Sequence, residues 1–345
     1  MSMPDRIGFC PTRSVTLLNH SETPDYSIVI PTYQRRDSLA RCLQAIQALR
    51  FPRDRFEVLV VDDGSPNPPA DLVASAHESL QVWLVTTRHA GPATARNTGG
   101  RLARGRYLVF TDDDCMPHED WLASIDRWTS SKPGAVAIGG HTVNELTDNV
   151  FAAASQGIID YLYEYFGGYS VPRRFFTSNN LVVPRAEFLN LGGFNETFAL
   201  AAAEDRDFCE RWSEAGGRLE YADDVKVSHA HVLDFPRFNR QHFNYGRGAF
   251  DLHRSRAGRG EGSLEIEPAR FYAGLVAYPL RQSRSWRAVV LSFLHLWSQI
   301  AYAGGYFFER LRRGWSVDAT RSAVDPADSP DAAVRTDNPS MKRIA

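Results

Sequence analysis

The chain of 345 residues has only four cysteines, Cys10, Cys42, Cys115 and Cys209. They are widely spaced and form no C-x-x-C pair, so neither a disulfide framework nor a structural zinc site is expected. The formal net charge is −2, which gives no sign of the basic surface that nucleic-acid binding requires. We therefore expect a protein of the reducing cytosol that has no nucleic-acid partner.

An N-terminal secretory signal is also missing. Residues 1–25 are polar and interrupted by prolines, and are predicted to be an N-terminal extension. Residues 289–308 have about the length that crosses a bilayer, but two serines, a histidine, a glutamine and two glycines weaken their hydrophobicity. Because arginines flank this run, residues 281–313 are predicted to form a helix peripheral to the cytoplasmic face of a membrane. A helix packed on the domain or in a homodimer is the alternative.

Composition is that of an ordinary globular protein, with 43% hydrophobic and 23% charged residues. The length allows one large α/β domain with appendages, or two domains. We predict a main domain over residues 26–255 and a helical region over residues 256–317. Residues 318–345 have few large apolar side chains and are predicted to be a disordered tail.

Short apolar runs alternate with amphipathic helical patterns in the first part of this domain. The expected strands are residues 27–30, 56–61, 82–85 and 107–110. Such alternation predicts an α/β fold with a Rossmann-like, mostly parallel central sheet flanked by helices. Ligands bind beyond the carboxyl ends of the strands in these sheets. The acids and hydroxyls that follow the strands should therefore gather at one edge.

The second part of the domain is less regular. Strands are expected at residues 135–140, 180–183 and 225–227, and helices at residues 151–166, 186–191 and 204–215. The aromatic residues between Tyr161 and Tyr169 suit an acceptor platform, although such spacing is more typical of a core. The segment from Tyr245 to Gly248 is predicted to be a mobile loop, with Arg247 reaching a phosphate.

Three consecutive aspartates follow the run 107–110. Adjacent carboxylates repel one another, and a hard divalent cation such as Mg²⁺ or Mn²⁺ would offset that repulsion. Alternate strand residues face the same side, so Asp112 and Asp114 form a D-x-D arrangement while Asp113 turns away. The same acids also suit a solvated turn that begins a helix, since Asp caps helices well.

Six segments resemble motifs of the family 2 glycosyltransferases, in that family's order. They are IPTYQR at 30–35, VVDDGS at 60–65, GPATARNTG at 91–99, FTDDD at 110–114, GGFNE at 192–196 and AEDRDF at 203–208. The resemblance extends from residue 26 to about residue 231, over more than half of the chain. It implies a GT-A fold in which residues 26–137 bind a nucleotide sugar and residues 138–255 bind the acceptor.

The activity that the resemblance implies is inverting sugar transfer, by default from a UDP-sugar, to a hydroxyl of a glycan or lipid-linked acceptor. A divalent ion, Mg²⁺ or Mn²⁺, would neutralise the departing diphosphate. Asp205 is the expected general base, with Glu204 beside it to bind an acceptor hydroxyl. Acids in the first turn of a helix are also favoured by its dipole, which is the plainer interpretation of this pair.

The resemblance also implies a metal site and a donor site. Asp114 is the expected metal ligand, Asp112 contacts the ion or the ribose, and His229 or His231 completes the shell unless both are structural. In the donor site, Asp63 would bind the base unless it is only a turn residue. The donor-binding residues are expected to be Pro31, Thr32, Tyr33, Asp63, Arg96, Asn97, Asp112 and Asp113.

Two of these residues have a structural alternative. Arg96 would contact the diphosphate or hold the acids in place by a bidentate pair, and Asp113 is expected to be mainly structural. Tyr33 would stack on the base.

Other classes of protein fit less well. A sugar-phosphate nucleotidyltransferase would carry a glycine-rich loop after the first strand, where this chain has residues 31–35. A nicotinamide-binding domain would need G-x-G-x-x-G there. A catalytically inactive carbohydrate-binding module would be expected to have lost Asp114 or Asp205, and both are present.

Overall fold

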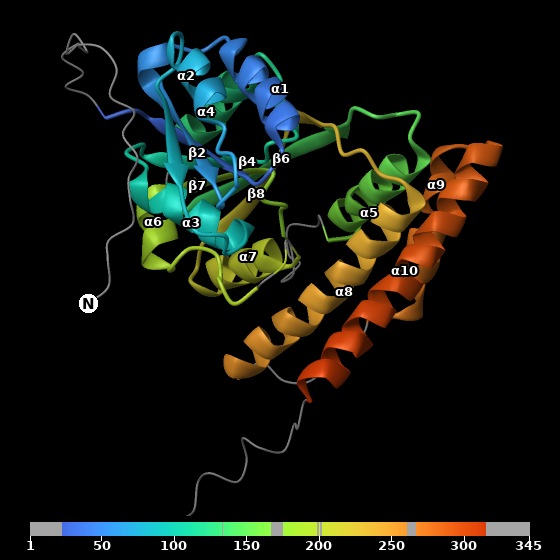
Figure 1. Ribbon diagram of the computed structural model, residues 1–345. Helices are drawn as coiled ribbons and strands as arrows, with labels where there is room; N and C mark the ends of the chain where they lie inside the picture. The colour runs from blue at the N-terminus through green and yellow to red at the C-terminus, as the bar shows by residue number, and fades with distance from the viewer. Residues whose placement is uncertain are drawn as a thin grey trace, which may run out of the picture.

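The computed structural model describes residues 23–132, 134–166, 175–198, 200, 202–260 and 267–314. One sheet of eight strands forms the centre, in the order β3-β2-β1-β4-β7-β6-β8-β5. Helices cover both of its faces, and a further group of helices lies beside it (Figure 1). The predicted N-terminal extension and disordered tail fall almost wholly outside the described residues.

The first half of the sheet is parallel, as predicted. Its strands are β1 (Tyr26–Thr32), β2 (Phe56–Asp62), β3 (Val82–Thr86) and β4 (Tyr107–Thr111). β1 pairs in parallel with both β2 and β4, and β3 pairs in parallel with β2. A 3-10 turn (Arg53–Arg55) precedes β2. The carboxyl ends of these strands therefore lie at one edge.

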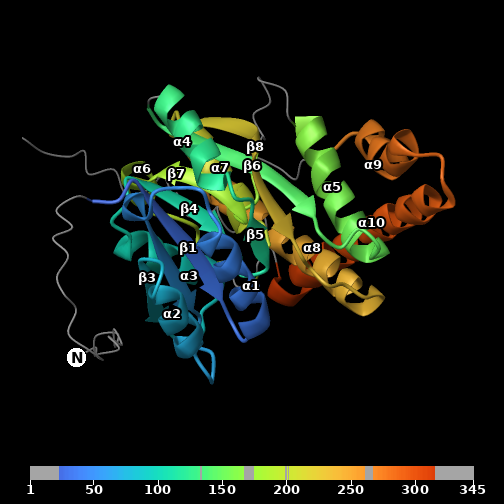
Figure 2. The same cartoon turned by 90° about the horizontal axis from the view of Figure 1, so that it is seen from above.

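Alternating strand residues build two cores, one on each face. Ile28 and Val58 pack with α1 (Arg36–Gln47), α2 (Ala70–His77) and α4 (Trp121–Ser131). Val29 and Leu59 pack with α3 (Pro92–Leu102), α6 (Arg185–Asn190) and α7 (Glu204–Glu214). In Figure 1 the first group of helices lies above the sheet and the second group below it, and Figure 2 looks down on the first group. Because both faces are covered, the strands are continuous apolar runs.

The second half of the sheet is mixed rather than parallel. β7 (Asn180–Pro184) runs antiparallel to β4 and to β6 (Val136–Asn144). β8 (Arg218–His229) is parallel to β6 and antiparallel to β5 (Cys115–Pro117). Hydrophobicity marks a buried strand but not its direction, which depends on how the connecting segments return to the sheet.

The acidic triplet lies in the turn between β4 and β5. The backbone N–H of Cys115 donates to the carbonyl of Asp112 at 3.1 Å, and β5 then pairs with the end of β8. Helix α4 begins only at Trp121, so the triplet does not cap it. The expectation of a solvated turn at a helix start is therefore wrong, because Asp113 and Asp114 are 2% and 3% exposed.

A group of four helices lies to one side of the sheet (Figures 1 and 2). They are α5 (Val150–Phe166), α8 (Phe235–Gly258), α9 (Ala269–Gln282) and α10 (Trp286–Arg313). The predicted boundary at residue 255 falls inside α8. Tyr161 and Phe166 of α5 are buried, as the core interpretation of these aromatic residues expects, and Tyr169 lies outside the described residues.

The predicted mobile loop around Arg247 is wrong, because these residues form the middle of α8. A Cβ atom on Gly246 would lie 1.8 Å from the carbonyl oxygen of Tyr302, and one on Gly305 would lie 1.8 Å from that of Phe243. The glycines therefore let α8 and α10 cross in backbone contact. Arg247 donates to Glu309 of α10 at 2.8 Å instead of reaching a phosphate.

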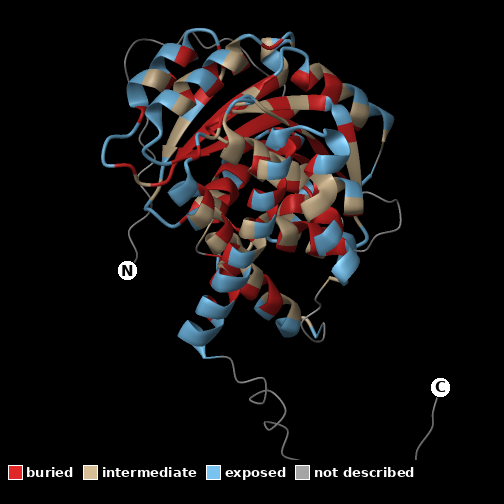
Figure 3. Cartoon of the chain, turned by 90° about the vertical axis from the view of Figure 1, so that its right-hand side faces the viewer, coloured by how far each residue is buried: buried red, intermediate tan, exposed pale blue. Residues whose placement is uncertain are grey.

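Helix α10 buries several polar residues and exposes a stripe of apolar ones, although Leu294 and Tyr306 are buried as well. Ser292, His295 and Ser298 are 7%, 0% and 0% exposed, whereas Phe293 and Ile300 are 59% and 55% exposed. His295 lies between the carbonyl oxygens of Leu275 and Ala154, at 2.9 and 3.2 Å. Figure 3 shows exposed and buried positions alternating along the helices of this side. None of the helices that the structure describes has the length and apolarity that a membrane crossing requires.

Candidate active site

One cavity of about 810 Å³ opens between the sheet edge and the group of four helices. The acids predicted from separate parts of the chain meet there, since they follow β4 and β8 or begin α7. Basic residues from three segments join them. The charged residues around its inner end are Arg35, Arg96, Asp112, Asp114, Glu204, Asp205, His229 and His231.

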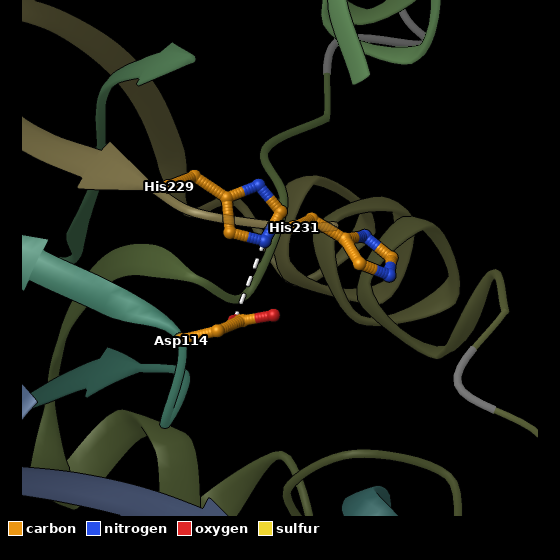
Figure 4. A group of neighbouring side chains, drawn as sticks. All are labelled: Asp114, His229 and His231. Carbon is orange, nitrogen blue, oxygen red and sulfur yellow. Dashed lines mark ion pairs between the residues drawn. The ribbon is translucent and has the colours of Figure 1, made fainter. Parts of the chain in front are cut away.

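Asp114, His229 and His231 form a candidate metal centre (Figure 4). One ligand atom from each residue lies within 4.8 Å of the other two, and His229 Nε2 is 3.3 Å from Asp114 Oδ1. β5 and β8 position them, since Cys115 pairs with His229 in the sheet. A carboxylate with two imidazoles suits a divalent first-row ion such as Mn²⁺, so these residues fit the predicted group.

The surroundings of the candidate metal centre keep the Asp114 carboxylate ionised. Burial alone would raise the pKa of Asp114, but the hydrogen bond with His229 and the charges of His229 and Arg35 hold it well below its usual range. Burial lowers the pKa of His231, which favours the neutral imidazole. For His229, Asp114 outweighs burial and raises the pKa. An ion bound there would displace the proton of His229.

Asp113 has the structural role predicted for it. Its carboxylate accepts from Thr32 Oγ1 at 2.7 Å and pairs with Arg35 Nη1 at 3.0 Å. Burial raises the pKa of Asp113 to about 7, although Arg35 and Thr32 act in the opposite direction. Arg35 also pairs with Asp114. The sequence contained Arg35 within a motif, but nothing in its position assigned it to these acids.

Asp112 is bound to Arg96 rather than grouped with the metal ligands. Arg96 donates to Asp112 Oδ1 at 2.6 Å and to Glu204 Oε1 at 3.0 Å. Arg96 therefore holds the acids in place, the second of its two predicted roles. Asp112 is not in the group of possible metal ligands found among the described residues, and its contact with the ion stays a prediction.

Glu204 and Asp205 stand at the start of α7. The residue before them, Ala203, adopts a left-handed conformation with φ 72°, which is unusual for a residue with a Cβ atom. Burial raises the pKa of both carboxyls, and their mutual repulsion raises that of Glu204 further. A raised pKa is what a buried general base needs in order to accept a proton near neutral pH. The neighbouring Asp207 pairs with Arg211 at 2.8 Å, so it is structural.

The predicted base-binding residues lie beside the loop that follows β3. Asp63 accepts from the backbone N–H groups of Ala90 and Gly91, both at 2.9 Å. Tyr33 is 37% exposed and stacks on His89, with ring centroids 4.2 Å apart. Asp63 therefore holds the loop at residues 90–91, and His89 covers one face of the Tyr33 ring. Binding of the base by Asp63 and Tyr33 stays a prediction. Pro31 and Thr32 end β1 as buried residues.

Asn97 links α3 to the loop before α7. Its amide group donates to the carbonyl of Phe194 and to Glu196, both at 2.8 Å, and its oxygen accepts from the N–H of Phe194 at 2.8 Å. Asn97 is 2% exposed and does not line the cavity. The predicted contact between Asn97 and the donor is therefore replaced by a structural role.

Gln241 and Tyr245 of α8 also face the acids, and sequence patterns did not identify them. Gln241 Nε2 donates to the Tyr245 hydroxyl at 2.7 Å, while Gln241 Oε1 is buried and has no partner among the described residues. Burial raises the pKa of Tyr245 to about 12, and the charges of Asp205, Glu204 and Asp112 contribute. Residues 245–248 were expected to form a loop, so the sequence did not predict that Gln241 and Tyr245 lie on one helix beside the acids.

Residues 27–190 match the family model described as Glycosyl transferase family 2. This part of the chain is a family 2 glycosyltransferase domain. The glycosyltransferase AglE of Haloferax volcanii is 28% identical over 67% of this chain and 75% of its own length. The pre-mycofactocin glycosyltransferase of Mycobacterium tuberculosis is 29% identical over 66% of this chain. The chain described here covers about half of the length of that second relative, 47%.

The fold of the glycosyltransferase is that of a solved GT-A enzyme. A mannosyltransferase of Pyrobaculum calidifontis, determined with GDP-Man and Mn²⁺, superimposes with a TM-score of 0.59 at 20% identity. The superposition covers 84% of this chain and 89% of the other. The family and fold predictions are therefore confirmed, and the nucleotidyltransferase alternative is not supported.

Proposed function

We propose that the protein is an inverting, metal-dependent glycosyltransferase that moves a sugar from a nucleotide diphosphate donor to a hydroxyl group of a glycan or lipid-linked acceptor. One observation carries the proposal. The candidate metal centre of Asp114, His229 and His231 lines the same cavity as Asp205. An ion-binding group and a buried base of raised pKa are the two parts that such a transfer needs.

Each of these groups has a defined task. A divalent ion held by Asp114 and the two histidines would supply positive charge to the diphosphate leaving group. Arg35, which pairs with Asp113 and Asp114, would bind the same phosphates. Asp205 takes the proton of the acceptor hydroxyl as that oxygen attacks the anomeric carbon. Glu204, held by Arg96, binds an acceptor hydroxyl and keeps a negative charge next to the base.

The donor and the ion are proposed from chemistry and relatives together. The Pyrobaculum neighbour holds GDP-Man and Mn²⁺, which supports a nucleotide sugar and Mn²⁺ or Mg²⁺ for this chain. Family resemblance favours a UDP-sugar. In this proposal the nucleotide lies near Tyr33, where His89 must move aside for a base to stack.

A donor panel tests the proposal. The full-length protein is incubated with Mn²⁺ and with UDP- and GDP-sugars, and release of the nucleoside diphosphate is measured. We expect one donor to be hydrolysed slowly and its turnover to stop when EDTA is added. No turnover with any donor, or turnover unaffected by EDTA, would contradict the proposal.

We also propose that the outer face of α9 and α10 makes a peripheral contact with the cytoplasmic face of a membrane. This face combines exposed apolar residues with arginines such as Arg281 and Arg284. Sedimentation with vesicles of phosphatidylcholine, with and without phosphatidylglycerol, tests the contact. We expect binding only to the anionic vesicles, weakened when Arg281 and Arg284 are both changed to Glu. Equal recovery with both vesicle types would contradict an electrostatic contact.

A further inference from the structure

We propose that the acceptor carries a long apolar chain, an alkyl or polyprenyl tail, which lies in an apolar arm of the active-site cavity. The arm is lined by Ile158, Leu162 and Phe166 of α5, by Phe271 and Leu275 of α9 and by Phe307 of α10. This inference rests on the proposed function, because the chain is assigned to the acceptor of that reaction.

The residues of the arm and the proposed catalytic acids Glu204 and Asp205 line one cavity. Arg206 follows Asp205 in α7 and lines the cavity with it. The guanidinium group of Arg206 stacks on Phe175 at 4.4 Å and hydrogen-bonds to Tyr302 of α10. Arg206 and Tyr302 both line the cavity, so they connect its wall beside Asp205 with α10.

The walls of the arm suit a hydrocarbon rather than a sugar. Phe271 packs against Tyr161 and Phe166 with ring centroids 5.4 and 6.1 Å apart, and Leu275 is 1% exposed. The Tyr161 hydroxyl, which belongs to this cluster, already donates to the carbonyl of Phe271 at 2.7 Å. A glycan in the arm would bury hydroxyl groups without partners, which is unfavourable.

The arm opens at a face that fits a lipid surface. Its rim includes Tyr272 and Phe307, which are 36% and 54% exposed. Phe307 continues a stripe along the outside of α10 at helical spacings of three and four residues. The other exposed members of the stripe are Trp286, Val289, Phe293, Leu296 and Ile300.

The charge of this face favours a lipid surface over a second copy of the chain as its partner. Between residues 268 and 314, all of which the structure describes, the only acid is Glu309, and it is 0% exposed. The same segment contains seven arginines, so two copies joined through this face would bring like charges together. Anionic headgroups complement it, and a tail lying among the lipids would enter the arm directly from this side.

Binding of alkyl β-glucosides of six to ten carbons, below their micelle concentrations, tests the inference with the full-length protein and Mn²⁺. We expect the Kd measured by calorimetry to fall about two- to fourfold for each methylene added. Phe307→Asp and Ala303→Trp, both at the rim, should each raise the Kd of the decyl glucoside at least tenfold. Phe293→Asp is the matched control, since Phe293 is equally exposed on the same helix but does not line the cavity.

A Kd that is independent of chain length would overturn the inference, as would equal weakening by Phe307→Asp and Phe293→Asp. Melting temperatures of the variants show that each is folded. Donor hydrolysis by the wild-type protein is measured in the same samples, which separates the two proposals. If a donor is hydrolysed but the Kd of the glucosides does not depend on chain length, only the apolar acceptor is contradicted. If the Kd depends on chain length but no donor is hydrolysed, the proposed glycosyl transfer is contradicted, and with it the assignment of the chain to an acceptor.

Discussion

Arg96 and Glu204 form an ion pair whose side chains are both 4% exposed, with Nη1 3.0 Å from Oε1. The pair joins α3, in the donor half, to the start of α7, which carries the proposed base. The other amino group of Arg96 holds Asp112 after β4. A single guanidinium group thus ties together the donor and acceptor sides of the site.

Replacing Arg96 by Met should destabilise the protein by about 3–5 kcal/mol, because Glu204 would remain buried without its partner. Urea denaturation measures this loss. Arg101→Met is the matched control on the same helix. The Arg101 side chain is 55% exposed and pairs with Glu196 at 3.5 Å, so a change of less than about 1 kcal/mol is expected. Equal effects of the two substitutions would argue against a buried bridge.

Asp205→Asn should lower the rate of transfer about 10²- to 10⁴-fold, the usual contribution of a general base. Binding of the donor with Mn²⁺ should change little, since Asp205 is not among the candidate metal ligands. Transfer assays and calorimetric titration with the donor separate the two effects. If Asp205→Asn abolishes donor binding as well, Asp205 belongs to the donor site and not to acid–base chemistry.

The pH dependence of transfer should report Asp205. A general base must be ionised to act, so kcat/KM should fall when Asp205 becomes protonated at low pH. Burial raises the pKa of Asp205, so this fall should begin at a pH above the usual pKa of aspartate. Glu204→Gln removes a neighbouring negative charge, so the fall of kcat/KM should then occur at lower pH. The measurements are made at saturating Mn²⁺, so that loss of the metal does not contribute to the pH profile. If Glu204→Gln leaves the fall of kcat/KM at low pH unchanged, that fall belongs to a group other than Asp205. The charged and titratable groups around Asp205 are Glu204, Arg96, Arg206, Tyr163, Cys209 and Tyr245.

His229→Ala and His231→Ala should each weaken Mn²⁺ binding, because each removes one ligand from the candidate metal centre. Electron paramagnetic resonance of free Mn²⁺ measures the affinity directly, without a donor. His118→Ala is a suitable control, since His118 is an exposed residue that contacts Ser228 outside the cavity. If only one of the two variants differs from this control, the other histidine is structural.

The crossing of α8 and α10 predicts opposite effects at adjacent glycines. Gly305→Ala should destabilise the protein by about 1–3 kcal/mol, because its Cβ atom would meet the backbone of Phe243. Gly304→Ala should stabilise it by about 0.5–1 kcal/mol, since the nearest atoms are 3.8 Å away and alanine is the better helix former. Thermal unfolding of the two variants provides the comparison, and the same sign for both would contradict this packing.

The alternation of strands and helices in the first half was readable from the sequence, because strands buried on both faces must be continuous apolar runs. The motifs at 30–35, 60–65 and 110–114 follow those strands, so their convergence at one sheet edge also followed. In the second half the sequence located β7 and α7 within a residue or two. It did not reveal that β7 runs antiparallel, since side-chain hydrophobicity carries no information on strand direction.

What the sequence determined by itself is therefore the family and the fold class, together with the prediction that Asp114 and Asp205 are functional acids. Tertiary structure alone decided how those acids are partnered. Arg96 binds Asp112, Arg35 binds Asp113 and Asp114, and both oxygens of Asp63 are taken by the loop at residues 90–91. Only the folded chain showed that Gly246 and Gly305 serve a helix crossing and that α10 presents its apolar side outward. These outcomes depend on contacts between residues far apart in the chain, which no local pattern records.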